Sequence, residues 1–227
     1  MRFSWRIELP QLAVIAAMFV AATVAWPRAP ERVPVHWNIQ GQVDRYGGKF
    51  EGLLLTPLIA LGLYVLLLVL PRFDPGYANY RRFATPYTVI RYLLIVVTTA
   101  IYTILLMSMF GHSVNTSAAI LSIIGLLFIV LGNLMGKIRP NWFVGVRTPW
   151  TLSSKTSWTK THRLAGWLFI LMGVVSLAAG LVGAPWAVVT MIVVCGASVV
   201  WMVLYSYLVW RTDPHRVPPA GTTPSDE

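Results

Sequence analysis

Six long stretches of this chain contain no Lys, Arg, Asp or Glu, and this pattern constrains the fold more than any other feature. A helix that crosses the hydrocarbon core of a bilayer needs about 20 mostly apolar residues. The chain is only 11% charged, whereas a soluble domain carries about 25% charged residues. The pattern therefore predicts an all-α, polytopic membrane helix bundle with six transmembrane helices. The expected spans are Leu9–Trp26, Leu53–Leu70, Tyr92–Phe110, Ser117–Met135, Trp167–Gly183 and Trp186–Trp210.

The basic residues indicate how the bundle is oriented. With the N-terminus inside the cell, the inner segments hold fourteen of the 18 Lys and Arg residues and the outer loops hold four. Cytoplasmic loops carry an excess of Lys and Arg, so we expect both termini in the cytoplasm. The net charge of +10 is then explained by loops beside anionic membrane lipid, and we expect no direct binding of nucleic acid. The first span could also be a signal peptide, but no A-x-A pattern ends it, which favours a retained anchor.

Glycines recur along two of the expected spans and predict close helix packing. Small residues seven apart share a helix face and let two backbones approach each other. We expect this packing to occur within one chain rather than between two chains. Ala184 and Pro185 alone separate the last two spans, which predicts a tight antiparallel helical hairpin. Gly125 and Gly132 are seven apart in the fourth span, and Gly136, just after it, forms a GxxxG with Gly132. Gly166, just before the fifth span, recurs at seven with Gly173 and Gly180.

Two loops are longer than a simple connection requires. The outer loop, Val33–Lys49, has β-forming residues on both sides of Asn38–Gly41, which predicts a small external hairpin. Such a hairpin could be a contact surface or a cap that packs on the bundle, and the sequence leaves both open.

The inner loop, Lys137–Ser153, leads into a helical stretch, Ser154–Arg163, whose N-cap is expected at Ser153 or Ser154. Trp158 and His162 share one face of this stretch and its cations share another, which is typical of an interfacial helix with its indole in the lipid. A plain membrane anchor and a protein-binding surface are the other readings.

The sequence offers little for catalysis. It has no HExxH motif, and the expected spans carry no carboxylate, so we predict no catalytic residue, no metal site and no cofactor. A transporter or channel is an alternative, as is an intramembrane enzyme of unknown substrate. Polar residues of the third span could line a path, although hydrogen bonds between helices are the stronger expectation for them. They are Thr98, Thr99, Tyr102 and Thr103.

Both unusual loops resemble a known family. The inner motif resembles the signature of the SdpI family of bacterial membrane immunity proteins. The outer motif resembles a small extracytoplasmic motif that often precedes that signature. The inner motif comprises Asn133, Asn141, Phe143, Gly145, Arg147, Thr148, Pro149, Trp150, Trp158, His162 and Arg163. The outer motif comprises His36, Trp37, Asn38, Asp44, Arg45 and Tyr46.

The resemblance implies a location and a function. It implies a multi-pass protein of the bacterial plasma membrane that protects the cell from a secreted toxic peptide. It also implies a signalling receptor that holds a transcriptional repressor at the membrane. On this view the outer motif contacts the peptide and the inner motif serves the cytoplasmic partner.

The chain divides into four parts. Residues 1–52 hold the first helix and the outer motif, and residues 53–116 hold the second and third helices. Residues 117–210 form the SdpI-like region with the inner motif. Residues 211–227 are expected to be a disordered cytoplasmic tail.

Overall fold

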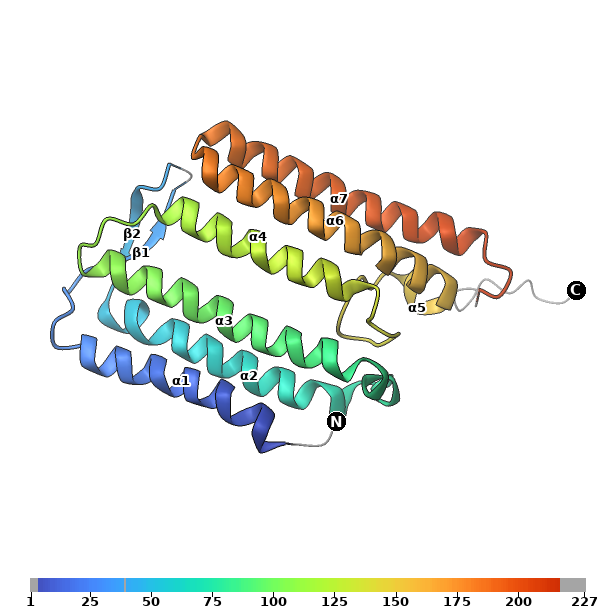
Figure 1. The fold of residues 1–227 in the computed structure, drawn as a ribbon, viewed down its shortest axis with the longest axis horizontal. Helices are drawn as coiled ribbons and strands as arrows, with labels where there is room; N and C mark the ends of the chain where they lie inside the picture. The colour runs from blue at the N-terminus through green and yellow to red at the C-terminus, as the bar shows by residue number, and fades with distance from the viewer. Residues whose placement is uncertain (1–3, 39, 217–227) are drawn as a thin grey trace, which may run out of the picture.

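The computed structural model describes residues 4–38 and 40–216, which form a bundle of long helices with one small antiparallel sheet (Figure 1). Within these residues, six helices are long and apolar enough to cross a membrane, so the predicted helix bundle is confirmed. The long helices are α1 Trp5–Ala25, α2 Leu55–Phe73, α3 Ala84–Met109, α4 Thr116–Met135, α6 Lys155–Val182 and α7 Pro185–Arg211. The short elements are β1 Val33–Trp37, β2 Val43–Gly47, the π-helix Phe50–Leu54, the 3-10 helix Tyr77–Phe83 and α5 Pro149–Ser153.

The two ends of the bundle differ in what they carry. The β1–β2 hairpin lies at one end, which we call the hairpin end (Figure 1). The α4–α6 connection with α5 lies at the opposite end, called the loop end, together with the start of α1 and the end of α7. The first and last described helices therefore open and close on the same side, as an even number of spans requires. Which side faces the cytoplasm stays a prediction.

Helices α4 and α6 pack through the recurring glycines. A Cβ atom placed on Gly132 would lie 2.7 Å from the Gly166 carbonyl oxygen, and one on Gly125 would lie 2.8 Å from the Gly173 carbonyl oxygen. Such distances exclude any side chain at these positions, because the backbones themselves are in contact. The predicted packing within one chain is confirmed. The predicted tight turn between the last two spans is also present, with Gly183 at φ 66° and Pro185 opening α7.

Two prolines in the second span each leave a backbone carbonyl without its helical N–H donor, and two tyrosines of α3 donate to these carbonyls instead. Pro57 has no N–H to donate to the Leu53 carbonyl, and Tyr102 Oη donates to that oxygen at 3.0 Å. Pro71 lies four residues after Leu67 in the same way, and Tyr87 Oη donates to the Leu67 carbonyl at 2.6 Å. These bonds fix α3 against α2 and supply the donor that each proline lacks.

The threonines of α3 behave differently from Tyr102. The hydroxyls of Thr98, Thr99 and Thr103 each donate to a carbonyl of α3 itself. Thr99 alone among these three also contacts another helix, at Met18 Sδ. The expected hydrogen bonds between helices are therefore confirmed for Tyr102 and wrong for Thr98 and Thr103.

Helices α1 and α3 begin earlier than the sequence predicted and thereby enclose an ion pair. Glu8 and Arg91 are 3% and 4% exposed. The two terminal nitrogens of Arg91 donate to the two carboxylate oxygens of Glu8 at 3.0 and 2.5 Å, which is a bidentate contact. Both residues lie just outside the expected uncharged spans Leu9–Trp26 and Tyr92–Phe110, in turns that the structure adds to α1 and α3.

The segment after α7 begins as ordered chain. Asp213 is 6% exposed, and its carboxylate accepts hydrogen bonds from Ser154 Oγ and from the His215 backbone N–H. Both bonds favour the ionised form, and together they lower the pKa of the Asp213 carboxyl below its ordinary value. The expected disorder is therefore wrong for residues 211–216, and residues 217–227 lie outside the described part of the chain.

Candidate functional site

The hairpin is a two-stranded antiparallel sheet that closes through a polar turn. Asn38 Oδ1 accepts from the backbone N–H groups of Gln40 and Gln42 at 3.0 and 2.9 Å. Gly41 adopts φ 78°, a conformation that glycine takes without strain. The register pairs Val33 with Gly47, as the predicted hairpin requires. Asn38 is therefore a turn-forming residue, and its carboxamide oxygen is already occupied.

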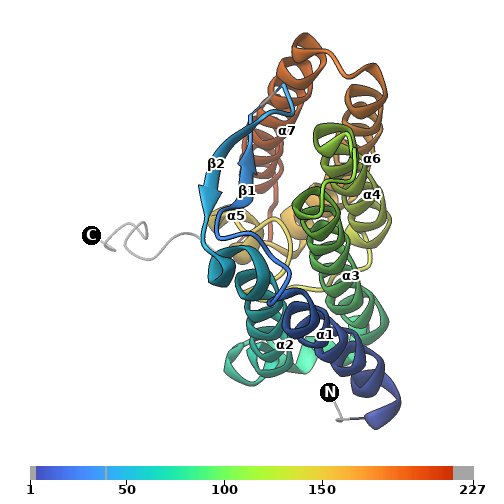
Figure 2. The same ribbon diagram turned by 90° about the vertical axis from the view of Figure 1, so that its left-hand side faces the viewer.

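One face of the hairpin packs on the bundle. Val33 is fully buried against Gly52, where a Cβ atom would lie 2.4 Å from the Val33 side chain. Val35 and Trp37 pack against the same apolar core of α1, α2 and α3. Viewed from the hairpin end, the two strands run from the α1–α2 side of the bundle towards the start of α7 (Figure 2). The hairpin is thus anchored along its length, and Trp37 belongs partly to that anchor.

The other face of the hairpin is exposed and carries paired polar groups. His36 Nδ1 lies 2.5 Å from Asp44 Oδ1, and Arg45 pairs with Glu51 at 2.7 Å. The Tyr46 ring is 49% exposed, and the Arg32 guanidinium lies 5.5 Å from its centroid. The structure therefore leaves four of the six outer-motif residues exposed, His36 on β1 and Asp44, Arg45 and Tyr46 on β2.

At the loop end, Asn141 organises the connection between α4 and α6, which we call the motif loop (residues 136–154). Its side chain is 2% exposed. The Asn141 Nδ2 donates to the carbonyls of Arg139 and Val144, both at 2.9 Å. Its Oδ1 accepts from the backbone N–H groups of Phe143 and Val144 at 2.9 and 2.7 Å. One carboxamide therefore fixes the backbone over six residues.

Asp74 ties the motif loop to the connection between α2 and α3, and the sequence analysis did not single it out. Its carboxylate is buried and accepts from Tyr80 Oη at 2.8 Å and from the Trp142 N–H at 3.1 Å. Asn79 Nδ2 adds a bond to the Pro140 carbonyl at 2.8 Å. One feature of the sequence could have pointed to this residue: Asp74 is the one acidic residue between positions 71 and 91.

Trp158 and His162 hold the loop from α6. The Trp158 Nε1 donates to the Ile138 carbonyl at 3.0 Å, and its ring stacks on His162 with centroids 4.1 Å apart. His162 Nε2 accepts from the Val146 N–H at 3.1 Å, while Nδ1 lies 2.8 Å from the Trp158 carbonyl oxygen. Both side chains are buried. The expected interfacial helix with its indole in the lipid is wrong, because residues 155–163 are the first turns of α6 and this face is covered by the loop.

Gly145 is required by its position over His162. Its φ is 110°, and a Cβ atom there would lie 2.3 Å from His162 Nε2. The glycine lets the backbone pass close to the imidazole, so that the next residue can donate to it.

Helix α5 is capped by Thr148 and rests on α7. Thr148 and Thr151 form a capping box, and Thr148 Oγ1 lies 2.9 Å from Ser206 Oγ. Pro149 occupies the first helical position. The Trp150 ring meets Tyr207 edge-on at 5.2 Å between centroids. Ser154 is the N-cap of α6, as predicted. Trp150 is thus half-buried on α7 and presents only part of its ring.

Six of the eleven inner-motif residues are exposed, namely Asn133, Phe143, Gly145, Arg147, Pro149 and Arg163. Phe143 is 39% exposed and its neighbour Trp142 is 54% exposed. Arg147 is exposed, and its guanidinium donates to the Trp142 carbonyl, which holds that segment in place. Arg163 is exposed on α6, and Asn133 is exposed and bonds to the Ile129 carbonyl of its own helix. Trp142 is the largest exposed residue of the loop that sequence reasoning left out of the motif.

These arrangements are suited to binding rather than to bond making. Both nitrogens of His162 are occupied by hydrogen bonds, so the imidazole is unavailable as a base or as a ligand. Asp44, the acid beside His36, sits on an exposed hairpin face. What the molecule presents at the hairpin end is a fixed surface of aromatic and charged side chains.

The comparisons with known proteins agree with both motifs. Residues 137–206 match the SdpI/YfhL protein family, and residues 13–61 match a domain of unknown function, DUF1648. The first match covers the motif loop, α5, α6 and most of α7. The second covers α1, the hairpin and the start of α2. No curated protein and no solved structure matches the chain.

Proposed function

From the membership of this multi-pass membrane protein in the SdpI/YfhL family, we propose that it is an immunity protein of a bacterial plasma membrane that protects its cell from a secreted toxic peptide. The hairpin end faces the outside and both termini face the cytoplasm. The uneven distribution of Lys and Arg supports this orientation.

The exposed face of the hairpin is the proposed contact for the peptide. The carrying observation is that four motif residues of the hairpin are exposed while Val33, Val35 and Trp37 anchor the hairpin on the core. Anchoring removes the entropy that a mobile loop would lose on binding. Tyr46 supplies a large, half-exposed ring, and Asp44 and Arg45 supply charges of both signs.

A growth experiment tests the immunity role. The gene is deleted in its source bacterium, and the deletion strain is grown in medium conditioned by the wild type. We expect slowed growth or lysis, restored by the wild-type gene on a plasmid. Equal growth of both strains in conditioned medium, with expression of the gene verified in the wild type, would contradict the proposal.

A second role, capture of a transcriptional repressor at the cytoplasmic side, is proposed for the exposed part of the motif loop. The observation that favours it is the pairing of two exposed aromatic rings, Trp142 and Phe143, with the exposed cation Arg147 beside them. Aromatic and Arg side chains are enriched where protein interfaces bind most strongly.

The second role is separable from the first. In cells treated with conditioned medium, Trp142→Ala and Phe143→Ala should lower the amount of a neighbouring-gene repressor in the membrane fraction while growth is protected. The control is Lys160→Ala, which changes an exposed residue on α6, outside the motif loop. Unchanged recruitment in both aromatic variants, or the lack of any repressor gene beside this one, would count against this role.

A further inference from the structure

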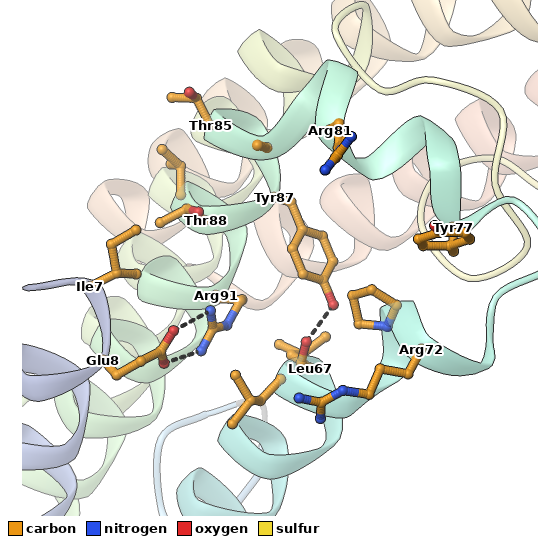
Figure 3. Close-up of a pocket in the computed structure, with 14 residues that line it drawn as sticks. Ile7, Glu8, Leu67, Arg72, Tyr77, Arg81, Thr85, Tyr87, Thr88 and Arg91 are labelled. Atoms are coloured by element: carbon orange, nitrogen blue, oxygen red, sulfur yellow. Dashed lines mark hydrogen bonds and ion pairs between the residues drawn. The ribbon is translucent and has the colours of Figure 1, made fainter. Parts of the chain in front are cut away.

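A cavity of about 710 Å³ opens at the loop end between α1, α2, the 3-10 helix and α3 (Figure 3). It lies in the N-terminal half of the chain, outside the SdpI/YfhL match, and neither role proposed above uses it. Three arginines line it, from three different elements: Arg72 on α2, Arg81 on the 3-10 helix and Arg91 on α3. Figure 3 shows them around the Tyr87 ring.

The charge around this cavity is not balanced. Glu8, also in the lining, is fully engaged by Arg91. Arg72 and Arg81 form no ion pair and no hydrogen bond with any residue of the described chain. Two cations from neighbouring elements therefore face one space without a counter-charge from residues 4–38 or 40–216, which favours an anion there.

A buried donor in the wall also lacks an acceptor. Arg91 is 4% exposed, and its two terminal nitrogens are used by Glu8. Its Nε–H, on the opposite edge of the guanidinium, has no partner. Buried polar groups are normally hydrogen-bonded, and an orphaned one calls for an explanation. A ligand oxygen in the cavity would supply the acceptor.

Hydroxyl groups add neutral donors to the same wall. Thr85 and Thr88 of α3 line the cavity. Further along the same helix, Thr98, Thr99 and Thr103 turn their hydroxyls back onto helix carbonyls. Thr85 and Thr88 make no such bond within the described residues. Their hydroxyls are thus free to donate to a ligand.

We propose that this cavity binds a phosphate group. Arginine forms planar, paired hydrogen bonds with phosphate oxygens, and a phosphate offers enough oxygens for several donors at once. Ile7, Leu67, Leu68 and Val89 complete the lining with apolar side chains of the spanning helices. A headgroup phosphate of a membrane lipid fits this combination, since its acyl chains would continue along those residues. A free phosphate shares the chemistry of the headgroup but gains nothing from the apolar wall.

Binding to the purified full-length protein in detergent tests this site. Native mass spectrometry counts bound molecules of dioleoyl phosphatidylglycerol and of dioleoylglycerol, which has the same chains without a phosphate. Inorganic phosphate is added in a parallel experiment as a soluble competitor. The test variant is Arg72→Gln/Arg81→Gln. The matched control is Arg82→Gln/Arg139→Gln, which removes the same charge from exposed residues outside the cavity lining.

We expect the phospholipid to bind and dioleoylglycerol not to bind, and the test variant to weaken binding about tenfold through two lost charge-assisted contacts. The control should change binding by less than about twofold. Competition by inorganic phosphate, with no preference for the phospholipid, would support the phosphate site and assign it to a soluble anion. Equal binding by the test and control variants, both eluting as folded protein, would overturn the proposal. Equal binding of the two dioleoyl compounds would overturn it as well.

Discussion

The two motif regions of this protein use their characteristic residues in opposite ways. In the hairpin, His36, Asp44, Arg45 and Tyr46 are exposed and pair with one another or with neighbouring charges. In the motif loop and the first turns of α6, the residues with the most hydrogen bonds, Asn141, Thr148 and His162, are buried and bond to backbone groups. A sequence motif can therefore mark a surface in one region and a scaffold in the other. The hairpin residues are available to a ligand, whereas the buried residues of the motif loop determine the shape of the chain.

The largest effect is expected from Asn141→Leu. The change leaves two buried N–H groups and two carbonyls without partners, and each costs about 1–3 kcal/mol. We expect the free energy of unfolding, measured in mixed micelles, to fall by about 3 kcal/mol or more. Asn133→Leu is the matched control, because Asn133 is exposed and bonds only to its own helix. Equal losses for the two variants would remove the scaffold role from Asn141.

Gly145→Ala comes next in size. The new Cβ would meet His162 Nε2, and the backbone there has φ 110°, a region that strains side-chain-bearing residues by about 1–3 kcal/mol. We expect a loss of about 2 kcal/mol in unfolding free energy. Gly136→Ala provides the comparison, since a Cβ there would contact nothing within 4 Å. A Gly145→Ala protein as stable as Gly136→Ala would show that the loop does not depend on this close approach.

Thr148→Val should have a smaller effect. It removes the N-cap of α5 and the contact with Ser206 Oγ while keeping the shape of the side chain. Loss of an N-cap costs about 1 kcal/mol, and a similar decrease in unfolding free energy is expected. Thr159→Val, at an exposed threonine that bonds back to Lys155, should change stability by less than about 0.5 kcal/mol. A larger loss of unfolding free energy for Thr159→Val than for Thr148→Val would show that the Thr148 cap of α5 does not stabilise the loop.

Asp44→Asn should affect stability least. The ion pair with His36 is exposed, with 60% and 41% of the two side chains accessible, and exposed pairs contribute about 0–1 kcal/mol. We expect a loss below about 0.5 kcal/mol that disappears at high salt. Asp213→Asn, at a buried carboxylate bonded to Ser154, should cost more and should keep its effect in salt. A large loss of unfolding free energy for Asp44→Asn that persists in high salt would show that this hairpin pair stabilises the fold, as the buried contacts of the motif loop do.

The fold was largely predictable because its main signals are local. Spans appear as long uncharged runs, and the hairpin appears as alternation around a polar turn. The glycine spacing in α4 and α6 predicted their contact correctly, since only glycine allows the backbones to meet. These features depend on residues close together in the sequence.

The parts that were missed depend on partners far apart in the chain. Glu8 and Arg91 looked like ordinary charges at the ends of spans, yet they neutralise each other across 83 positions. Asp74 meets the Trp142 N–H across 68 positions. Helical spacing correctly placed Trp158 and His162 on one face, but it could not show that the loop folds back over that face.

We propose that the exposed residues of the hairpin recognise the toxic peptide. The most direct measurement is growth in wild-type conditioned medium of the deletion strain carrying Tyr46→Ala, normalised to the amount of protein in the membrane. Phe73→Ala, which removes a 75% exposed aromatic ring at the loop end, is the matched control. We expect Tyr46→Ala to reach normal abundance and to lose protection at least about tenfold, as expected for an aromatic contact worth about 2 kcal/mol, while Phe73→Ala protects like the wild type. Full protection by Tyr46→Ala at normal abundance would contradict it.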